Sequence, residues 1–519
     1  MSPAPLRPFA LFDRPEINLG KGGKFAVSLS PELAAADVSP VIDIYDLENL
    51  THPGGHLGWW KFSSEALGTS ATGRIDFVGG RTTLDVDGLT PIASWRNPSP
   101  VRCRGLAVSL VLRANTTNAI VHMDRAPAFG TEADARRFRA DWSRNYASPR
   151  FAAPGYVAPA GATVHIAAPN IFRRDAVGVL CLDIFRMLRQ NGIAAEIYAD
   201  NYNLEMNDVV RRLDALPSRT GPTDQILYFA STHDPHLDAV LAAPCRRRIA
   251  FFHGITDPLL LRVFNPELSA VCERALVQLP RFAEFDALAA NSRAMARQLV
   301  TSFGDQPKWR AVDVAVIAPK LIAGLPPPPA VPKPVARGAR FLTVGRVKSH
   351  KKLEDVLALF AAYLKLDPDA ECWIVGGDPD KPYRDYLDWV ERVDLSLPKG
   401  KVKWLGSINE AELAKRYAGA SAYVSMSEHE GFCLPLLEAM LQGLPVFAYA
   451  IEAVLETLGG AGVSFEKKEF PHLAASIHAR LGDPARLAGL VERQYAHACA
   501  MAATMDGSGF LELLAPARL

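Results

Sequence analysis

The chain has few of the features that mark secreted or membrane-spanning proteins. Its seven cysteines are odd in number and scattered, and none forms a Cys-x-x-Cys pair, which argues against a disulfide framework or a zinc knuckle. No run of about 18 uninterrupted apolar residues occurs, so no transmembrane helix is expected. Residues 1–20 lack the basic and apolar regions of a secretion signal. We therefore expect a cytoplasmic protein.

An excess of charge of either sign is also missing. Lys and Arg total 57 and Asp and Glu total 56, for a formal net charge of +1. This balance argues against a protein that works by coating nucleic acid. Hydrophobic residues make up 49% and charged residues 22%, which excludes a disordered chain. A length of 519 residues predicts three or four domains.

Residues 1–150 have the pattern of a β-rich, sandwich-like accessory domain. Short alternating apolar segments recur there between glycines and prolines, which is typical of antiparallel strands joined by turns. A trailing helix is predicted at 132–146. The tryptophans Trp59, Trp60 and Trp95 suit either the core of a sandwich or stacking on sugar rings, and the sequence leaves both interpretations open.

From about residue 161 the pattern changes to alternating strands and helices. Apolar runs such as 226–230 and 248–252 predict buried strands, and Asn291-Ser292 after another strand suits a helix N-cap. Six prolines between Pro326 and Pro334 predict a stiff linker. Similar βα units resume after this linker.

This alternation predicts two doubly wound α/β domains, at 151–335 and 336–490. Ligands of such domains bind at the carboxyl ends of the strands. Residues 491–519 are predicted to form a helix that crosses back to the first of the two domains, near 490–515.

The segment Ser427–Met440, with the sequence SEHEGFCLPLLEAM, is the most informative. A strand is followed by a polar loop containing Gly431, and Pro435 suits the first turn of a helix. The N–H groups of a helix N-terminus bind phosphate or sugar oxygens. Glu430 before the helix and Glu438 inside it can reach different parts of one ligand. Either glutamate alone would also suit an ordinary surface position.

The segment Val344–Leu353, VGRVKSHKKL, combines a strand end with two cations. Gly345 permits a close approach, and Arg346 and Lys351 can neutralise a diphosphate leaving group. Taken alone, the segment would also suit a solvated basic turn. Gly376-Gly377 after the next strand predicts a tight turn and lacks a full dinucleotide-binding fingerprint.

Together these segments resemble the retaining GT-B glycosyltransferases of family 4, the glycosyl transferases group 1. Their hallmark E-x7-E corresponds to Glu430 and Glu438 in an EGFxLPxLEAM context, and VGRVxxHK is the matching basic motif. Residues 455–462 resemble the later PETVGGAG segment. The resemblance covers roughly 161–519 and implies a GT-B fold, in which two Rossmann-like domains face a cleft. Lys352 departs from the pattern, since many members carry glycine there.

The resemblance also implies roles for individual residues. Arg346 and Lys351 would bind the donor diphosphate, Glu430 would lie beside the transferred sugar, and Glu438 would hold the ribose hydroxyls. The cations and the helix dipole would assist the leaving group, so neither a metal nor another cofactor is required. The residues expected to bind the donor are Gly345, Arg346, Lys351, Glu430, Gly431, Phe432, Cys433, Leu434 and Glu438.

The first α/β domain carries weaker similarities. Asp175 and Gly178 open its first helix, where family members place a loop near donor and acceptor. His253 follows a buried strand in a stretch similar to one in a bacterial polysaccharide subgroup, so we expect it to point into the cleft and to act with Glu430, Arg346 and Lys351 in catalysis. A structural histidine at a strand end is the alternative. His350 and His429 lie within the motifs and receive no direct role.

The expected function is transfer of a hexose-type sugar, with retention, from a nucleotide-diphosphate sugar to a glycan or lipid-linked glycan in bacterial surface polysaccharide biosynthesis. Two alternatives stay open: another GT-B sugar-nucleotide enzyme, such as an epimerase or phosphorylase, and a degenerate module that binds a glycan or a partner. The basic runs 136–144 and 246–248 suit either anionic lipids of the inner membrane or solvent. The sequence leaves the donor open, with a lean towards GDP-mannose.

Overall fold

The computed structural model describes residues 161–515 except 173–174, 203–208, 305–313, 323, 326–328, 330–333, 336 and 378. Before residue 161 it describes 13–18, 22–28, 38–46, 56–63, 65, 70–78, 81–86, 89–96, 106–114, 120–123 and 128–129. The predicted helix at 132–146 and most of the proline-rich linker lie outside the described residues. The chain forms two compact units, Met1–Ser148 with Ala199–Arg211, and Pro149–Tyr198 with Arg212–Leu519.

The first unit contains two antiparallel sheets, in agreement with the β-rich pattern. Trp60 is only 1% exposed and lies in the core with Ile42 and Ile44, so a sugar cannot stack on it in this structure. Trp59 is partly exposed, and the side chain of Trp95 lies outside the described residues. The strand order of one sheet is β1 (Asp13–Asn18), β2 (Gly22–Ser28), β5 (Ser70–Val78) and β6 (Arg81–Val86). The order of the other is β10 (Ala128–Phe129), β8 (Leu106–Ala114), β3 (Val38–Asp46), β4 (His56–Lys61) and β7 (Ala93–Arg96), and β9 (Ile120–Met123) also pairs with β8.

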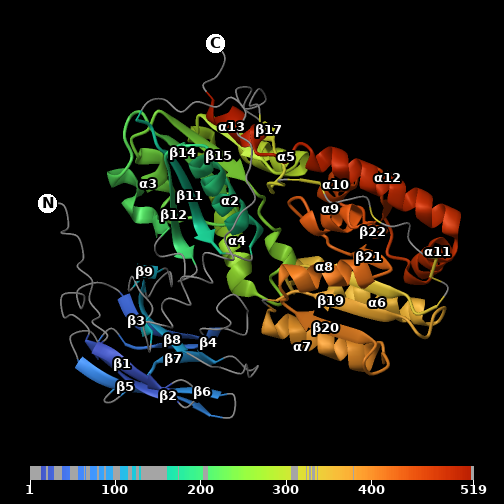
Figure 1. Cartoon of the computed structure of the whole chain (residues 1–519), viewed down its shortest axis with the longest axis horizontal. Coiled ribbons are helices and arrows are strands. Elements are labelled where there is room, and N and C mark those ends of the chain that lie inside the picture. Colours follow the sequence, from blue (N-terminus) through green and yellow to red (C-terminus); the bar gives the residue numbers. More distant parts are fainter. Residues whose placement is uncertain are drawn as a thin grey trace. The chain divides into compact units, whose positions relative to one another are not determined.

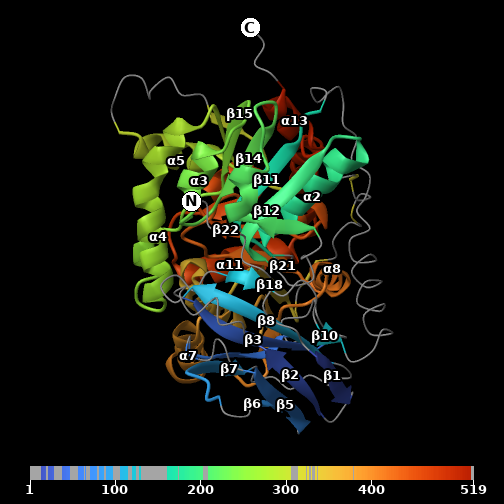
Figure 2. The ribbon, with the colours of Figure 1, turned by 90° about the vertical axis from the view of Figure 1, so that its left-hand side faces the viewer.

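The second unit holds the two predicted α/β sheets, of which the first is seven-stranded. Its β14 and β15 are the apolar runs QILYFA and RRIAFF, and they pair in parallel in the middle of the sheet. Such runs suit strands buried on both faces. In Figure 2, α4 (Pro266–Gln278) and α5 (Arg293–Ser302) lie on one side of the strands and α2 (Ala176–Gln190) on the other. The strand order is β13 (Val210–Arg212), β12 (Ala195–Tyr202), β11 (Val164–Ile171), β14 (Gln225–Ala230), β15 (Arg247–Phe252), β16 (Ala287–Ala290) and β17 (Val314–Val316).

The other sheet has six parallel strands, with the order reversing between β18 (Arg340–Val344) and β21 (Ala422–Ser425). A doubly wound sheet binds its ligand beside such a reversal, at the carboxyl ends of the strands. The order is β20 (Val402–Gly406), β19 (Glu371–Val375), β18, β21, β22 (Val446–Tyr449) and β23 (Val463–Phe465). The α-helices that follow β18 along the chain are α6 (Leu353–Leu364), α7 (Lys381–Trp389), α8 (Glu410–Gly419), α9 (Leu434–Leu441), α10 (Glu452–Leu458), α11 (Phe470–Gly482), α12 (Pro484–Ala502) and α13 (Ser508–Leu514).

The C-terminal segment differs from the single crossing helix that was predicted near 490–515. Helix α12 is continuous from Pro484 to Ala502, so a boundary at 490 falls inside it, and a separate helix, α13, follows (Figure 1). The return to the first sheet is made by α13. The backbone carbonyl of Leu513 in α13 accepts a hydrogen bond from the Arg247 side chain in β15 at 2.8 Å. The centroid of the Phe510 ring, also in α13, lies 5.2 Å from that of Phe251 in β15. Among the described residues, no helix has both the length and the apolarity needed to cross a membrane.

Candidate active site

The two predicted motifs meet at the reversal point of the six-stranded sheet. Val344–Leu353 follows β18, and Ser427–Met440 follows β21, the next strand in the sheet. Arg346 is exposed at the edge of this site, whereas Lys351 is largely covered. A small pocket lies between the two strand ends, lined by Thr343, Val344, Gly345, Arg346, Lys351, Leu353, Tyr423, Ser425 and Ser427.

Lys351 and Glu430 form a direct ion pair in this site. The Lys351 Nζ lies 2.7 Å from Glu430 Oε1, and the two side chains are 19% and 9% exposed. Burial alone would raise the pKa of Glu430, but Lys351, together with Ser427 and His429, holds it below its ordinary value. The site therefore presents an ionised carboxylate beside an ammonium at neutral pH.

Gly376 lets the carbonyl of Gly345 come close to the neighbouring strand. A Cβ at Gly376 would lie 1.7 Å from the Gly345 oxygen, which no real structure tolerates. The backbone N–H of Gly345 donates to the carbonyl of Val375 at 2.9 Å, which fixes the same approach. Gly376 thus does more than permit a turn, because it makes room for the strand end that carries Arg346.

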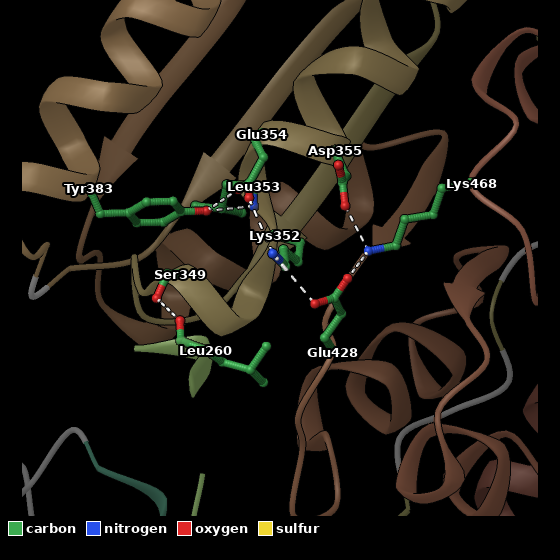
Figure 3. A network of polar contacts seen from close by, with 9 residues as sticks. All are labelled: Leu260, Ser349, Lys352, Leu353, Glu354, Asp355, Tyr383, Glu428 and Lys468. Carbon is green, nitrogen blue, oxygen red and sulfur yellow. Dashed lines mark hydrogen bonds and ion pairs between the residues drawn. The ribbon is translucent and has the colours of Figure 1, made fainter. Parts of the chain in front are cut away.

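Lys352 occupies the left-handed region, with φ 52° and ψ 50°. This conformation costs a side-chain-bearing residue about 1 kcal/mol or more relative to glycine. The Lys352 ammonium lies 3.4 Å from Glu428 Oε2, and Lys468 donates to both Glu428 and Asp355 at 2.7 Å (Figure 3). The network ties the turn carrying Lys351 to the loop carrying Glu430.

Glu438 has partners that the sequence did not reveal. Lys320, in the segment after β17, donates to Glu438 Oε1 at 2.5 Å, and the Tyr417 hydroxyl donates to Oε2 at 3.1 Å. The Glu438 side chain is 27% exposed, so it remains open to a ligand. No local pattern links Lys320 to Glu438, since 118 residues separate them.

The loop between the two glutamates is held in an unusual shape. Cys433 is the N-cap of α9 with φ 67°, a left-handed conformation, and Leu434 is the first residue of that helix. Burial raises the pKa of the Cys433 thiol well above its ordinary value. The carbonyl of Phe432 accepts a hydrogen bond from Thr457, which lies in the predicted segment 455–462. The segment 455–462 therefore helps to fix the loop between Glu430 and Glu438.

His253 directly follows β15, as the sequence predicts, and lies against the loop of the second domain. Its orientation into a cleft stays a prediction. A Cβ on Gly431 would be 2.4 Å from the His253 carbonyl oxygen, so the two loops touch. Burial lowers the pKa of His253 to about 3, which keeps the ring neutral. Its Nε2 has no hydrogen-bond partner among the described residues. Asn291, predicted only as part of a helix cap, lies beside it and donates to its carbonyl at 3.1 Å.

Asp175 and Gly178 have local structural roles in the described residues. The Asp175 carboxylate caps α2 by accepting from the N–H of Val177 at 3.1 Å and of Gly178 at 3.4 Å. A Cβ on Gly178 would lie 2.2 Å from the Phe172 oxygen. Their predicted nearness to donor and acceptor stays a prediction. His350 is buried with its pKa well below the ordinary value, because of burial and the cations around it, Lys351 first.

Comparison with known proteins gives a family match for the region that contains both motifs. Residues 332–496 match the family model described as Glycosyl transferases group 1. The O-antigen chain mannosyltransferase B of Escherichia coli is 33% identical over 103 residues, which is 20% of this chain and 27% of that protein. The D-inositol 3-phosphate glycosyltransferase of Geodermatophilus obscurus is 25% identical over 378 residues, 64% of this chain and 84% of that protein.

Solved structures share the fold of the larger unit. The Anabaena protein HepE, solved with UDP and glucose, superposes with a TM-score of 0.51 at 17% identity, covering 68% of this chain and 99% of its own. The sucrose-phosphate synthase of Thermosynechococcus elongatus gives 0.50 at 17% identity, over 68% and 98% of the two chains. These likenesses show the GT-B fold and confirm the predicted pair of Rossmann-like domains. The chain spans only 27% of the length of the E. coli mannosyltransferase that it matches.

Proposed function

We propose that this chain, which carries a glycosyl transferases group 1 domain in a GT-B fold, is a nucleotide-sugar-dependent glycosyltransferase. The substrate classes are a hexose-type sugar on a nucleoside diphosphate and a glycan or lipid-linked glycan acceptor, in bacterial surface polysaccharide biosynthesis. The observation that carries the proposal is the buried ion pair between Lys351 and Glu430, at the reversal point of a sheet matched by the family model. The relatives include a mannosyltransferase and a protein solved with UDP and glucose.

The donor would lie along the edge formed by the two motifs. Arg346 and Lys351 would meet the diphosphate, because both are cations at the carboxyl end of β18. The Lys351 ammonium has three donors and uses one on Glu430, so it can also donate to a phosphate oxygen. The N-terminus of α9 adds positive potential. This set would stabilise the departing nucleotide without a metal.

Glu430 would act on the sugar and Glu438 on the ribose. Because Lys351 holds the pKa of Glu430 low despite burial, the carboxylate accepts hydrogen bonds from sugar hydroxyls and stabilises positive charge that develops at the anomeric carbon. Glu438, half-covered by Lys320 and Tyr417, would accept the ribose hydroxyls. We propose retention of the anomeric configuration on the basis of the family resemblance alone.

The acceptor would approach from the first α/β domain, on the side of His253, and Asp175 and Gly178 would lie near it. His253 is neutral at physiological pH because burial lowers its pKa to about 3, so it would act as a hydrogen-bonding group and not as a cation. Work at the cytoplasmic face of the inner membrane, with peripheral contact, is part of the same proposal.

The test begins with nucleotide binding by calorimetry and thermal shift, using UDP, GDP, UDP-glucose and GDP-mannose. We expect one nucleotide sugar to raise the melting temperature, since a ligand that binds only the folded state stabilises it. Arg346→Ala should weaken nucleotide binding, and Glu430→Gln should abolish turnover of the nucleotide sugar. Lys381→Ala serves as a control, because Lys381 pairs with Asp385 on the exposed surface.

Each alternative has its own outcome in these experiments. A degenerate module would bind no nucleotide. An epimerase would convert the nucleotide sugar without an acceptor, and a phosphorylase would need inorganic phosphate instead. Full activity of both Arg346→Ala and Glu430→Ala would show that the site is wrongly placed.

A further inference from the structure

His253 and Asn291 are adjacent at one edge of the seven-stranded sheet. Strands β15 and β16 pair with Phe252 opposite Ala290, so the next residue of each strand, His253 and Asn291, emerges at the same carboxyl edge. The Asn291 amide nitrogen donates to the His253 carbonyl at 3.1 Å. The two residues therefore form one polar unit at the end of the sheet.

Each of them carries a buried polar atom that has no hydrogen-bond partner in the part of the chain that the structure describes. Asn291 is 4% exposed and His253 is 9% exposed, and the unpartnered atoms are Asn291 Oδ1 and His253 Nε2. The orientation of the amide is fixed by its neighbour, because a flipped Asn291 would place its oxygen against the His253 carbonyl oxygen. Buried polar atoms in folded proteins are nearly always paired, so two adjacent exceptions need an explanation.

The loop that carries Glu430 passes directly over this unit. A Cβ on Gly431 would lie 2.4 Å from the His253 oxygen and 2.6 Å from the Asn291 amide nitrogen. The atoms that face Gly431 are thus the paired His253 oxygen and Asn291 nitrogen, and the unpartnered atoms belong to the same two side chains, on the first α/β domain beside the loop of Glu430.

The chemistry of the two atoms indicates the kind of group that they bind. Asn291 Oδ1 is a neutral acceptor, and the buried His253 ring is neutral because its pKa is lowered to about 3. A neutral acceptor and a neutral imidazole suit an uncharged hydroxyl, whereas a phosphate would require the cations Arg346 and Lys351. The partner is therefore a sugar hydroxyl and not the diphosphate.

We propose that Asn291 Oδ1 accepts a hydrogen bond from a hydroxyl of the sugar being transferred, which makes Asn291 a specificity-determining residue of the site. This inference rests on the proposed function. It differs from a purely structural role, in which Asn291 would only hold the His253 carbonyl through its amide nitrogen. The structural role leaves the unpartnered oxygen unexplained.

The experiment compares Asn291→Ala with the wild-type chain on UDP-glucose, GDP-mannose and the mono-deoxy sugar analogues of each. The readouts are release of the nucleoside diphosphate and calorimetric binding of free UDP and GDP. In the wild type, one mono-deoxy analogue should lose about tenfold to a hundredfold in kcat/KM, because it leaves a buried acceptor unpaired. In Asn291→Ala this discrimination should collapse towards one, while binding of the free nucleotide stays unchanged.

Ser292→Ala is the matched control, since the Ser292 hydroxyl caps the same helix by accepting from Met295 N–H at 3.2 Å. It should lower the melting temperature and keep the discrimination. Asn291→Ser replaces Asn291→Ala if that variant does not fold. The inference is overturned if the Asn291 variant keeps the wild-type ratio, or if the wild type discriminates against no mono-deoxy analogue. A wild type that binds neither nucleotide nor nucleotide sugar overturns the proposed function itself.

Discussion

Asp380 joins the two α/β domains through a buried charge. Its Oδ1 accepts from Lys348 Nζ at 2.8 Å within the second domain and from the Asn265 amide at 2.6 Å in the first. The side chains of Lys348 and Asp380 are each only 7% exposed. Asp380→Ala takes the carboxylate away from a buried ammonium, which costs about 3–5 kcal/mol. Asp385→Ala on the same helix removes an exposed partner of Lys381 and should cost about 0.5 kcal/mol or less.

The assay is differential scanning calorimetry of Asp380→Ala, Asp385→Ala and the wild type at one protein concentration. At about 2 °C per kcal/mol for a chain of this size, Asp380→Ala should melt about 6–10 °C earlier and Asp385→Ala within about 1 °C of wild type. The double variant Lys348→Met with Asp380→Leu should recover most of the loss, because an apolar pair replaces a buried ionic one well. Equal melting temperatures for Asp380→Ala and Asp385→Ala would refute the reasoning.

Three further predictions concern single positions. Gly376→Ala should reduce nucleotide binding and lower the melting temperature, because its Cβ would lie 1.7 Å from the Gly345 oxygen. Gly482→Ala, whose Cβ would meet no described atom within 4 Å, should leave nucleotide binding unchanged and should not lower the melting temperature in thermal-shift assays, since alanine suits a helix better than glycine. Lys352→Gly should be about 1 kcal/mol more stable than Lys352→Ala in urea denaturation, since both lose the ion pair with Glu428 and only alanine keeps the left-handed strain at φ 52°. His253 has a pKa of about 3 when folded and an ordinary value of 6.5, so the unfolded chain binds the proton first and stability falls as the pH drops below 6.5. Between pH 7 and pH 5 this histidine should lower the free energy of unfolding by about 2 kcal/mol. In urea denaturation, the free energy of unfolding of His253→Gln should therefore depend on pH less than that of the wild type, by about 2 kcal/mol over this range; an unchanged dependence would contradict the burial of His253.

Local patterns predicted the elements that position the site. The apolar run 248–252 became the central strand β15, Ser292 caps α5 through its hydroxyl, and Pro435 lies in the first turn of α9. These features depend on residues that are close in the sequence, so local sequence patterns can predict them. The boundary at 490 missed a signal of the same kind, because Asp483 accepts from the N–H of Ala485 and Arg486 and marks the start of α12.

The partners of the functional side chains depend on tertiary packing and were not predictable in this way. Lys320 is 118 residues from Glu438, and Asn265 is 115 residues from Asp380. Spacing along one helix or strand cannot indicate such pairs, since their approach depends on how two sheets pack. The sequence predicts Asn291 only as part of a helix N-cap, because that role depends on neighbouring residues. Its contact with His253, 38 residues away, results from the pairing of β15 and β16.

Glu456, in the second α/β domain, has a structural role that depends on a contact with the first α/β domain. It lies in the segment 455–462, which resembles the PETVGGAG segment of the family and to which the sequence assigns no function. In the structure its carboxylate accepts from the backbone N–H groups of Arg293 and Ala294, each at 2.7 Å, at the N-terminus of α5 in the other domain. A helix N-terminus favours a negatively charged group such as a carboxylate. Because α5 begins directly after Asn291 and Ser292, the second domain holds in place the strand end that we propose contacts the sugar.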